Sequence, residues 1–244
     1  MRLTLVGDDS GDEVLEQALT ARGHSVDRKR RGSDLLTSHH HYDAVILELC
    51  LPDLPGLLIL RKLRQVTSVP VIILTTDASE RSVVRGLRSG ADDYLVKPAR
   101  IGELTARLEA ITRRAAILAS SVDSVIVSGD VRVDLTARQV SVAGNPIRLT
   151  PTEFELLSIL AERAGSAVSR AQLMDHVWGD AFIAVSRTLD VHMARLRTKL
   201  NRPRLIITLR GYGYQWAHDS TTVDLPATAD TTAETPLAGR DIRG

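Results

Sequence analysis

The chain has 244 residues with 43% hydrophobic and 25% charged side chains, a composition typical of a globular protein with room for two hydrophobic cores. No apolar run approaches the roughly 20 residues of a membrane-spanning helix, and the single cysteine, Cys50, excludes an intramolecular disulfide, so the sequence predicts a cytoplasmic protein. The net charge of +1 is uneven: residues 125–218 carry 12 Lys and Arg against 8 Asp and Glu (+4), which is mild for a nucleic-acid binder.

Short apolar runs alternate with amphipathic stretches over residues 1–114. The runs predict buried strands at Leu3–Val6, Ala44–Leu49, Val69–Leu74 and Asp93–Val96, with a weaker signal near His24–Asp27. The stretches between and after them predict helices at Glu13–Arg22, Leu57–Gln65, Ser79–Ser89 and Ile101–Arg114. This alternation predicts the α/β class, a five-unit (βα) domain whose parallel sheet is covered by helices on both faces. In such folds the carboxyl ends of the strands gather the functional groups.

Charged and hydroxyl side chains occupy those strand ends: Asp8, Asp9, Glu48, Thr75, Tyr94 and Lys97. They belong to the motifs LVGDD (5–9), YDAVILELCLP (42–52), LT (74–75) and GADDYLVKP (90–98). Several such motifs in this order resemble the receiver domain of bacterial two-component response regulators. The resemblance implies a doubly wound fold, an aspartate that accepts a phosphoryl group from a histidine kinase, and two adjacent acids that hold Mg²⁺.

Two positions depart from that pattern. Glu48 stands where the family has its phosphoacceptor aspartate, and Gly7 stands at the first metal-binding acid, leaving Asp8 as the matching ligand and Asp9 one place further on. Mg²⁺ requires near-ideal octahedral geometry, so the loss of one acid is expected to weaken its binding. The extra methylene of glutamate displaces the nucleophilic oxygen by about 1 Å, which can cost on the order of 100-fold in rate. The sequence therefore predicts a degenerate phosphoacceptor site and no resident cofactor.

Three roles remain open for Glu48. With Lys97 and Thr75 it could supply a permanent negative charge that holds an active-like arrangement. It could instead be a structural ion pair, because a buried charge needs a partner in either case. Residual phosphorylation by a kinase is the third role. For the receiver as a whole, a further alternative is that it binds a protein or a small ligand in the pocket that a phosphoryl group would otherwise occupy.

Charged residues near the end of this domain predict a partner surface. In the OmpR/PhoB branch of the family, receivers form homodimers through the fourth helix, fifth strand and fifth helix, using ion pairs between subunits. The resemblance places five residues there: Arg85, Asp92, Asp93, Glu103 and Arg107. A solvated charged face is the alternative, since exposed pairs contribute only about 0–1 kcal/mol each. The run at 39–41, three histidines, predicts a polar loop and no metal site.

Residues 115–123 predict a linker, and 124–218 predict a second, smaller domain. Four short Val- and Ile-rich strands are expected at Ser124–Val127, Val131–Asp134, Gln139–Val142 and Asn145–Leu149. Capping boxes at Thr150–Glu153 and Ser169–Gln172 predict the starts of two helices. A third helix and a hairpin, Leu205–Leu209 with Tyr214–Trp216, complete the order. The Thr-, Ala- and Asp-rich segment 219–244 predicts a disordered acidic tail.

The third helix, Arg187–Leu200, is the centre of this domain. Leu189, Met193, Leu196 and Leu200 recur at helical spacing and predict one core-facing side, and the other side carries basic and small groups. An Arg-bearing helix face suits the major groove of DNA. An ordinary solvated basic face is the alternative.

The motifs RTLDVH…RLR…KL (187–200) and TLRGYGY (208–214) resemble the winged helix-turn-helix effector domain of OmpR/PhoB-type transcription factors. The resemblance implies that Val191, His192 and Arg195 face the major groove, with Arg195 as the base reader. It also implies mainly phosphate contacts from Arg187, Thr188, Arg197 and Lys199, and a minor-groove contact from Arg210. Asp190 is expected to pair with a neighbouring arginine. The sequence as a whole predicts a non-enzymatic, sequence-specific transcription regulator that acts independently of aspartyl phosphorylation. The implied partners are double-stranded DNA with repeated half-sites, a second copy of the chain, RNA polymerase and a cognate histidine kinase.

Overall fold

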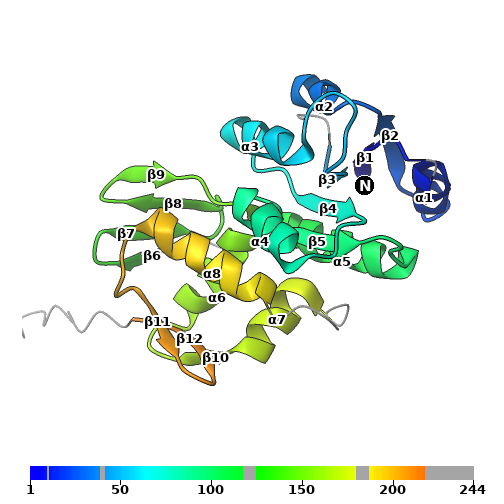
Figure 1. Cartoon of the computed structure of the whole chain (residues 1–244). Helices are drawn as coiled ribbons and strands as arrows, with labels where there is room; N and C mark the ends of the chain where they lie inside the picture. Colours follow the sequence, from blue (N-terminus) through cyan, green and yellow to red (C-terminus); the bar gives the residue numbers. More distant parts are fainter. Residues whose placement is uncertain (10, 39–41, 118–124, 180–186, 218–244) are drawn as a thin grey trace, which may run out of the picture.

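The computed structural model describes residues 1–9, 11–38, 42–117, 125–179 and 187–217 (Figure 1). The N-terminal domain is built on a five-stranded parallel sheet in the order β2-β1-β3-β4-β5. Its strands are β1 (Arg2–Val6), β2 (Ser25–Lys29), β3 (Ala44–Leu47), β4 (Val71–Thr75) and β5 (Asp93–Val96). The predicted α/β class and parallel sheet are confirmed, although β3 ends at Leu47, so Glu48 follows the strand and does not lie in it.

Helices cover both faces of this sheet. They are α1 (Gly11–Thr20), α2 (Gly32–Ser38), α3 (Gly56–Val66), α4 (Glu80–Ser89) and α5 (Ile101–Ile117). Side chains of α1 and α5 pack in one core around Leu5 and Ile46, and those of α2, α3 and α4 pack in a second core around Val45 and Ile73. Strands buried on both faces have apolar side chains on both, which is why they appear as continuous hydrophobic runs in the sequence.

Helix α2 was not predicted, and its cap explains why. The helix has seven residues, and the backbone N–H groups of Gly32 and Ser33 donate to the carboxylate of Asp53 at 3.0 and 2.9 Å. A helix N-terminus leaves donors that need acceptors, and here the acceptor comes from about 20 positions further along the chain. No local capping signal marks such a start.

The C-terminal domain places three helices between two antiparallel sheets. The first sheet has the order β6-β7-β8-β9 (Val125–Ser128, Val131–Asp134, Gln139–Val142 and Asn145–Ile147). The helices are α6 (Pro151–Glu162), α7 (Arg170–Trp178) and α8 (Arg187–Leu200). The second sheet, β10-β12-β11, joins the predicted hairpin of β11 (Ile206–Leu209) and β12 (Gly213–Trp216) to the unpredicted three-residue strand β10 (Ala167–Ser169). Both capping boxes are confirmed, at Thr150 with Glu153 and at Ser169 with Gln172.

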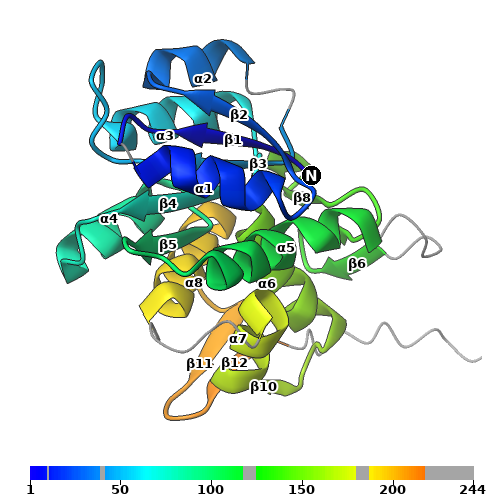
Figure 2. The same cartoon turned by 90° about the vertical axis from the view of Figure 1, so that its right-hand side faces the viewer.

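The two domains pack directly against each other. Figure 1 shows α8 lying alongside α4, and Figure 2 shows α5 next to α6 and α7. No helix in the described part of the chain is long and apolar enough to span a membrane. The acidic tail, the histidines at 39–41 and most of the expected linker fall outside the described residues, and α5 continues to Ile117, three residues into that linker.

Candidate functional site

A hollow of about 440 Å³ opens at the carboxyl edge of the parallel sheet. Its lining includes Asp8, Asp9, Glu48 and Cys50. The strand ends bring these residues together because the loops after β1 and β3 meet at this edge, next to the loop after β5. The predicted clustering of polar groups at this edge is therefore observed.

Lys97 is the centre of this cluster. Its Nζ lies 2.7 Å from Glu48 Oε2, 3.1 Å from Asp12 Oδ1 and 3.3 Å from Asp9 Oδ2. Burial lowers the pKa of Lys97, but hydrogen bonds and charge from Glu48 and Asp12 outweigh it, so the pKa lies above its ordinary value. The expected Glu48–Lys97 contact is present, and the lysine stays charged at every physiological pH.

Asp12 is a member of this site that the sequence did not reveal. It lies in the first turn of α1, is 1% exposed, and accepts a hydrogen bond from the backbone N–H of Asp9 at 3.1 Å. A Cβ added at Gly7 would lie 2.3 Å from Asp12 Oδ2. The carboxylate of Asp12 therefore fills the space that a side chain at position 7 would need. Helix α1 thus supplies a carboxylate close to the place where Gly7 lacks one.

The remaining predicted pocket residues do not form a metal-binding arrangement. Asp8 points to Arg30, with 3.6 Å between Oδ1 and Nε, and its side chain is half exposed. Among the residues that the structure describes, no three His, Cys, Asp or Glu side chains are placed to hold a metal ion. Thr75 is buried at the end of β4, and the Tyr94 hydroxyl donates to the Asp77 carbonyl at 2.7 Å. Burial, with the charges of Asp77 and Glu48, raises the pKa of Tyr94 to about 12.

Helix α8 has the predicted bounds and the predicted core-facing side. Leu189, Met193, Leu196 and Leu200 are all buried in the core of the C-terminal domain. Asp190 pairs with Arg170 at 2.6 Å and accepts from the Tyr214 hydroxyl at 2.7 Å, as expected of a local partner. These contacts attach the start of α8 to α7 and to the hairpin.

The opposite side of α8 is covered by the N-terminal domain. Val191 packs in the core that contains α3 and α4. His192 is 1% exposed, with Nε2 3.1 Å from the Asp92 carbonyl oxygen, and Arg195 donates to the carbonyl oxygen of Leu87 at the end of α4. The three residues expected to face the bases therefore contact the receiver in this structure, at α4 and at Asp92 just before β5.

Three of the four residues expected to meet phosphates are buried or paired within the chain. Thr188 is buried, and Arg197 donates to the Ile206 carbonyl and the Thr208 hydroxyl at 2.9 and 2.7 Å. Lys199 Nζ contacts Glu153 Oε2 and donates to the Arg148 carbonyl at 3.0 Å. Arg210 is exposed at the turn of the hairpin, whereas the side chain of Arg187 lies outside the described set. In this conformation the basic face expected to meet DNA is therefore not freely exposed.

Glu153 fastens this covered face to its own domain. Arg195 Nε lies 2.8 Å from Glu153 Oε1, and the Thr150 N–H donates to Oε2 at 2.9 Å. Burial raises the pKa of Glu153, but the charges of Lys199 and Arg195 outweigh it and leave the pKa below its ordinary value. One buried carboxylate therefore holds two basic residues of α8 and caps α6.

Family models match both halves of the chain. A response regulator receiver domain matches residues 5–109, and the C-terminal domain of transcriptional regulatory proteins matches residues 144–216. The response regulator ArlR of Staphylococcus aureus is 42% identical over 205 residues, which cover 82% of this chain and 91% of ArlR. The chain is a response regulator of the OmpR/PhoB type. It carries a receiver and a DNA-binding winged helix.

Solved structures resemble this response regulator over both domains. Two single-substitution variants of RitR match with TM-scores of 0.72 and 0.74 at 25% identity, covering 88% of this chain and 98% of RitR. The receiver match spans less than half of the chain, so scores of this size require both domains to superpose in one relative placement. The placement of the winged helix relative to the receiver is therefore similar in those structures.

The charges expected to join two receivers are used within one chain. Asp92 is 0% exposed, and its Oδ2 accepts from Arg64 at 2.8 Å and from the Val71 N–H at 2.9 Å, while Oδ1 accepts from the Thr152 N–H of the winged helix at 3.2 Å. Asp93 forms a buried pair with Arg107 at 2.7 Å, and Glu103 contacts the same guanidinium at 2.8 Å. Arg85 alone of the five is exposed. The expected inter-subunit role of Asp92 and Asp93 is not available in this conformation, because both carboxylates are already satisfied.

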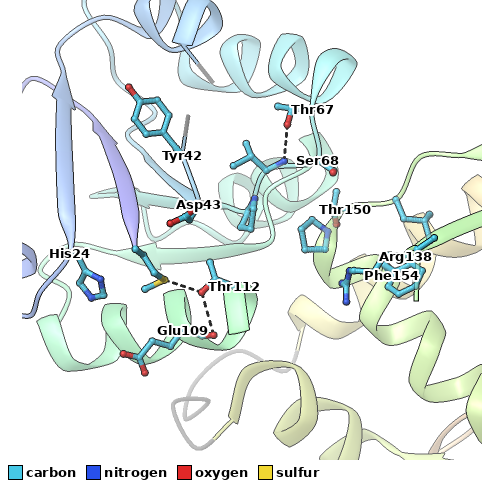
Figure 3. A pocket seen from close by; sticks show the side chains of 16 residues that line it. His24, Tyr42, Asp43, Thr67, Ser68, Glu109, Thr112, Arg138, Thr150 and Phe154 are labelled. Atoms are coloured by element: carbon cyan, nitrogen blue, oxygen red, sulfur yellow. Dashed lines mark hydrogen bonds between the residues drawn. The ribbon is translucent and has the colours of Figure 1, made fainter. Parts of the chain in front are cut away.

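A second hollow, of about 1060 Å³, lies between the domains at the amino-terminal edge of the receiver sheet. Figure 3 shows His24 and Glu109 on the receiver side and Arg138 with Phe154 on the winged-helix side. Arg138 stacks over the Phe154 ring at 4.5 Å and pairs with Glu155 at 3.5 Å, and Asp43 pairs with Arg2. The domain junction is thus packed along α4, β5 and α5 and open beneath the starts of the other strands.

Proposed function

We propose that this response regulator binds specific DNA sequences and regulates transcription without aspartyl phosphorylation. The observation that carries the proposal is the closed ionic cluster of Lys97 with Glu48 and Asp12. The lysine that would meet an incoming phosphoryl group is already bound by these two carboxylates and, at 3.3 Å, by Asp9. Opposite charges at 2.7–3.1 Å in a partly buried site resist replacement by an exogenous anion.

The geometry of Glu48 also argues against its use as a nucleophile. Oε2 is bound to Lys97, and Oε1 accepts from the Leu49 N–H at 3.2 Å. We further infer that Mg²⁺ binds weakly, because Asp8 turns to Arg30 and Asp12 turns to Lys97. A hard divalent cation needs several oxygen ligands converging on one point, and these carboxylates diverge.

The Glu48–Lys97 ion pair is formed in a structure in which the receiver covers α8. The pair is therefore not sufficient to expose the DNA-binding helix. This favours the structural role for Glu48 over a permanently active one. We infer that binding to DNA requires the receiver and winged helix to separate. A homodimer through α4, β5 and α5 would occupy the surface that α8 now covers, so α8 and a second copy compete for it.

Labelling and DNA selection together test the proposal. The purified chain, incubated with a small-molecule phosphodonor and millimolar Mg²⁺, is expected to remain unlabelled and to select the same DNA sequences from a random pool with and without the donor. Stoichiometric labelling accompanied by a gain in DNA affinity would instead identify a conventional phosphorylation switch.

The roles of Arg195 and Arg197 are separable. Arg195→Ala is expected to reduce the preference for the selected site over random DNA by about 1–3 kcal/mol and to relax preference at one base pair. Loss of its contact with Leu87 changes the affinity for both DNAs alike. Arg197 holds the hairpin through Ile206 and Thr208, so Arg197→Ala is expected to weaken binding to selected and random DNA alike. The slope of the logarithm of the binding constant against the logarithm of salt concentration is expected to decrease by about one unit. Binding isotherms on both DNAs at several salt concentrations measure this.

Thr198→Ala is the matched control, because Thr198 is exposed on α8 and its hydroxyl donates only to the helix carbonyl of Ala194. Its affinity is expected to be unchanged. Equal losses for Arg195→Ala on selected and random DNA would show that Arg195 does not read a base.

A further inference from the structure

His192 lies at the junction between receiver and winged helix, where its neighbours determine which ring nitrogen carries the hydrogen. Its Nε2 lies 3.1 Å from the Asp92 carbonyl oxygen, which can only accept, so Nε2 carries the hydrogen. Its Nδ1 is buried and has no hydrogen-bond partner. A proton added at Nδ1 would therefore create a buried cationic N–H with no acceptor, which is costly.

The charges around His192 do not compensate such a proton. The charged receiver side chains nearest to His192 form two pairs, Asp92 with Arg64 of α3 and Asp93 with Arg107 of α5. The two arginines of the neighbouring part of α4, Arg85 and Arg88, are exposed. From the winged helix, α6 contributes Glu153, and α8 contributes Arg195 and Lys199. Every carboxylate in this set is already bound to an arginine or lysine. The indole of Trp178 on α7 covers another side of the ring, with centroids 5.8 Å apart.

We propose that His192 is a proton-sensitive latch: its neutral form holds α8 on the receiver, and uptake of one proton drives the two domains apart. The closed arrangement accommodates only the neutral ring, whereas in the open arrangement the ring is exposed to water and can be protonated freely. Separation of the two domains is thereby coupled to proton uptake. This goes beyond the proposed function, because it names a signal, a fall in pH, that acts without a kinase.

The direction of the effect follows from linkage. Burial and the charge of Arg195 lower the pKa of His192 in the closed form, although Glu153 and Asp92 act in the opposite direction. In the open form the pKa returns towards about 6.5. The closed form is therefore favoured above that pH and loses its advantage as the pH falls below it. With one proton taken up, the ratio of open to closed molecules is expected to rise roughly tenfold between about pH 7.5 and about pH 5.5.

The test measures domain separation in the absence of DNA, because a protonated histidine would also attract phosphate and so raise DNA affinity by a second route. Small-angle scattering of the full chain is expected to show an increasing radius of gyration as the pH falls through this range. His192→Gln keeps a donor for the Asp92 carbonyl but cannot titrate, and it is expected to stay closed throughout. DNA selection with the same proteins tests the proposed function independently, since a chain can bind specific DNA whether or not protons open it.

Two control variants isolate the effect. His176→Gln removes an exposed histidine of α7. His24→Gln removes a second histidine whose ring nitrogens are buried, which lines the hollow at the amino-terminal edge of the receiver sheet. Both are expected to keep the pH dependence of the unmodified chain. An NMR titration of the His192 ring needs no variant and is expected to give a pKa below 6.5 for the closed chain. A radius that does not change with pH, or a His192→Gln protein that still opens as the unmodified chain does, would overturn the proposal.

Discussion

Replacing Asp92 with asparagine is expected to release α8 and to raise DNA affinity by about tenfold or more. Three N–H donors converge on this carboxylate, from Arg64, Val71 and Thr152, and the last belongs to the winged helix. An amide has one oxygen, so at least one donor loses its acceptor. A hydrogen bond to a charged group is worth about 1.5–3 kcal/mol, and about 1.4 kcal/mol corresponds to a tenfold change in an equilibrium constant.

Asp93→Asn is the matched control for this variant. The two acids are adjacent and equally buried, but Asp93 bonds only within the receiver, to Arg107 and to the Tyr94 N–H. Both variants are expected to melt at lower temperature, since each removes a buried negative charge that pairs with an arginine, Arg64 or Arg107. Only Asp92→Asn is expected to enlarge the chain in small-angle scattering and to bind the selected DNA more tightly. Equal DNA affinity of the two variants would show that Asp92 does not hold the domains together.

Restoring the two family acids is expected to be insufficient to restore phosphorylation. In a Gly7→Asp, Glu48→Asp double variant the new Cβ at position 7 would lie 2.3 Å from Asp12 Oδ2, a distance that real Cβ atoms do not adopt. The Asp12 carboxylate would have to shift away from position 7, which disturbs its contact with Lys97. Adding Asp12→Ala to form a triple variant removes this conflict. The triple variant is expected to be labelled by a phosphodonor at least about 100-fold faster than the double variant, in a reaction that requires Mg²⁺.

Asp12→Ala alone controls for a general loosening of the pocket and is expected to remain unlabelled, because Glu48 still occupies the phosphoacceptor position. If the double variant were labelled as fast as the triple variant, Asp12 would not be what blocks the site.

Local sequence signals predicted most of the fold, and the failures were long-range. The bounds of α8 and β5 and both capping boxes follow from spacing within a few residues, so they were predictable. Helix α2 and strand β10 depend on partners far along the chain, Asp53 for the helix cap and β12 for the strand pairing. Neither partner leaves a signal near the element that it stabilises.

The same distinction applies to the site. Lys97 and Glu48 were paired from their positions at the strand ends, but Asp12 lies in the first turn of α1, beyond the motif that marks the pocket. Gly7 did indicate that another residue would enter the pocket, because the side chain missing at this position leaves space that a neighbouring side chain can fill. For α8, a polar helix face looks the same in sequence whether it meets water, DNA or another domain. Only the contacts of His192 and Arg195 with the receiver distinguish these environments.

The dual use of α8 limits how this regulator can evolve. Val191, His192 and Arg195 are the side chains proposed to face the bases of DNA, and the same three pack on the receiver. A substitution that retargets the protein to a new operator therefore also alters how much of it is available at rest. If these residues read the operator as proposed, operator choice and basal output depend on one set of side chains, and a change in the first is expected to need a compensating change where α8 meets the receiver.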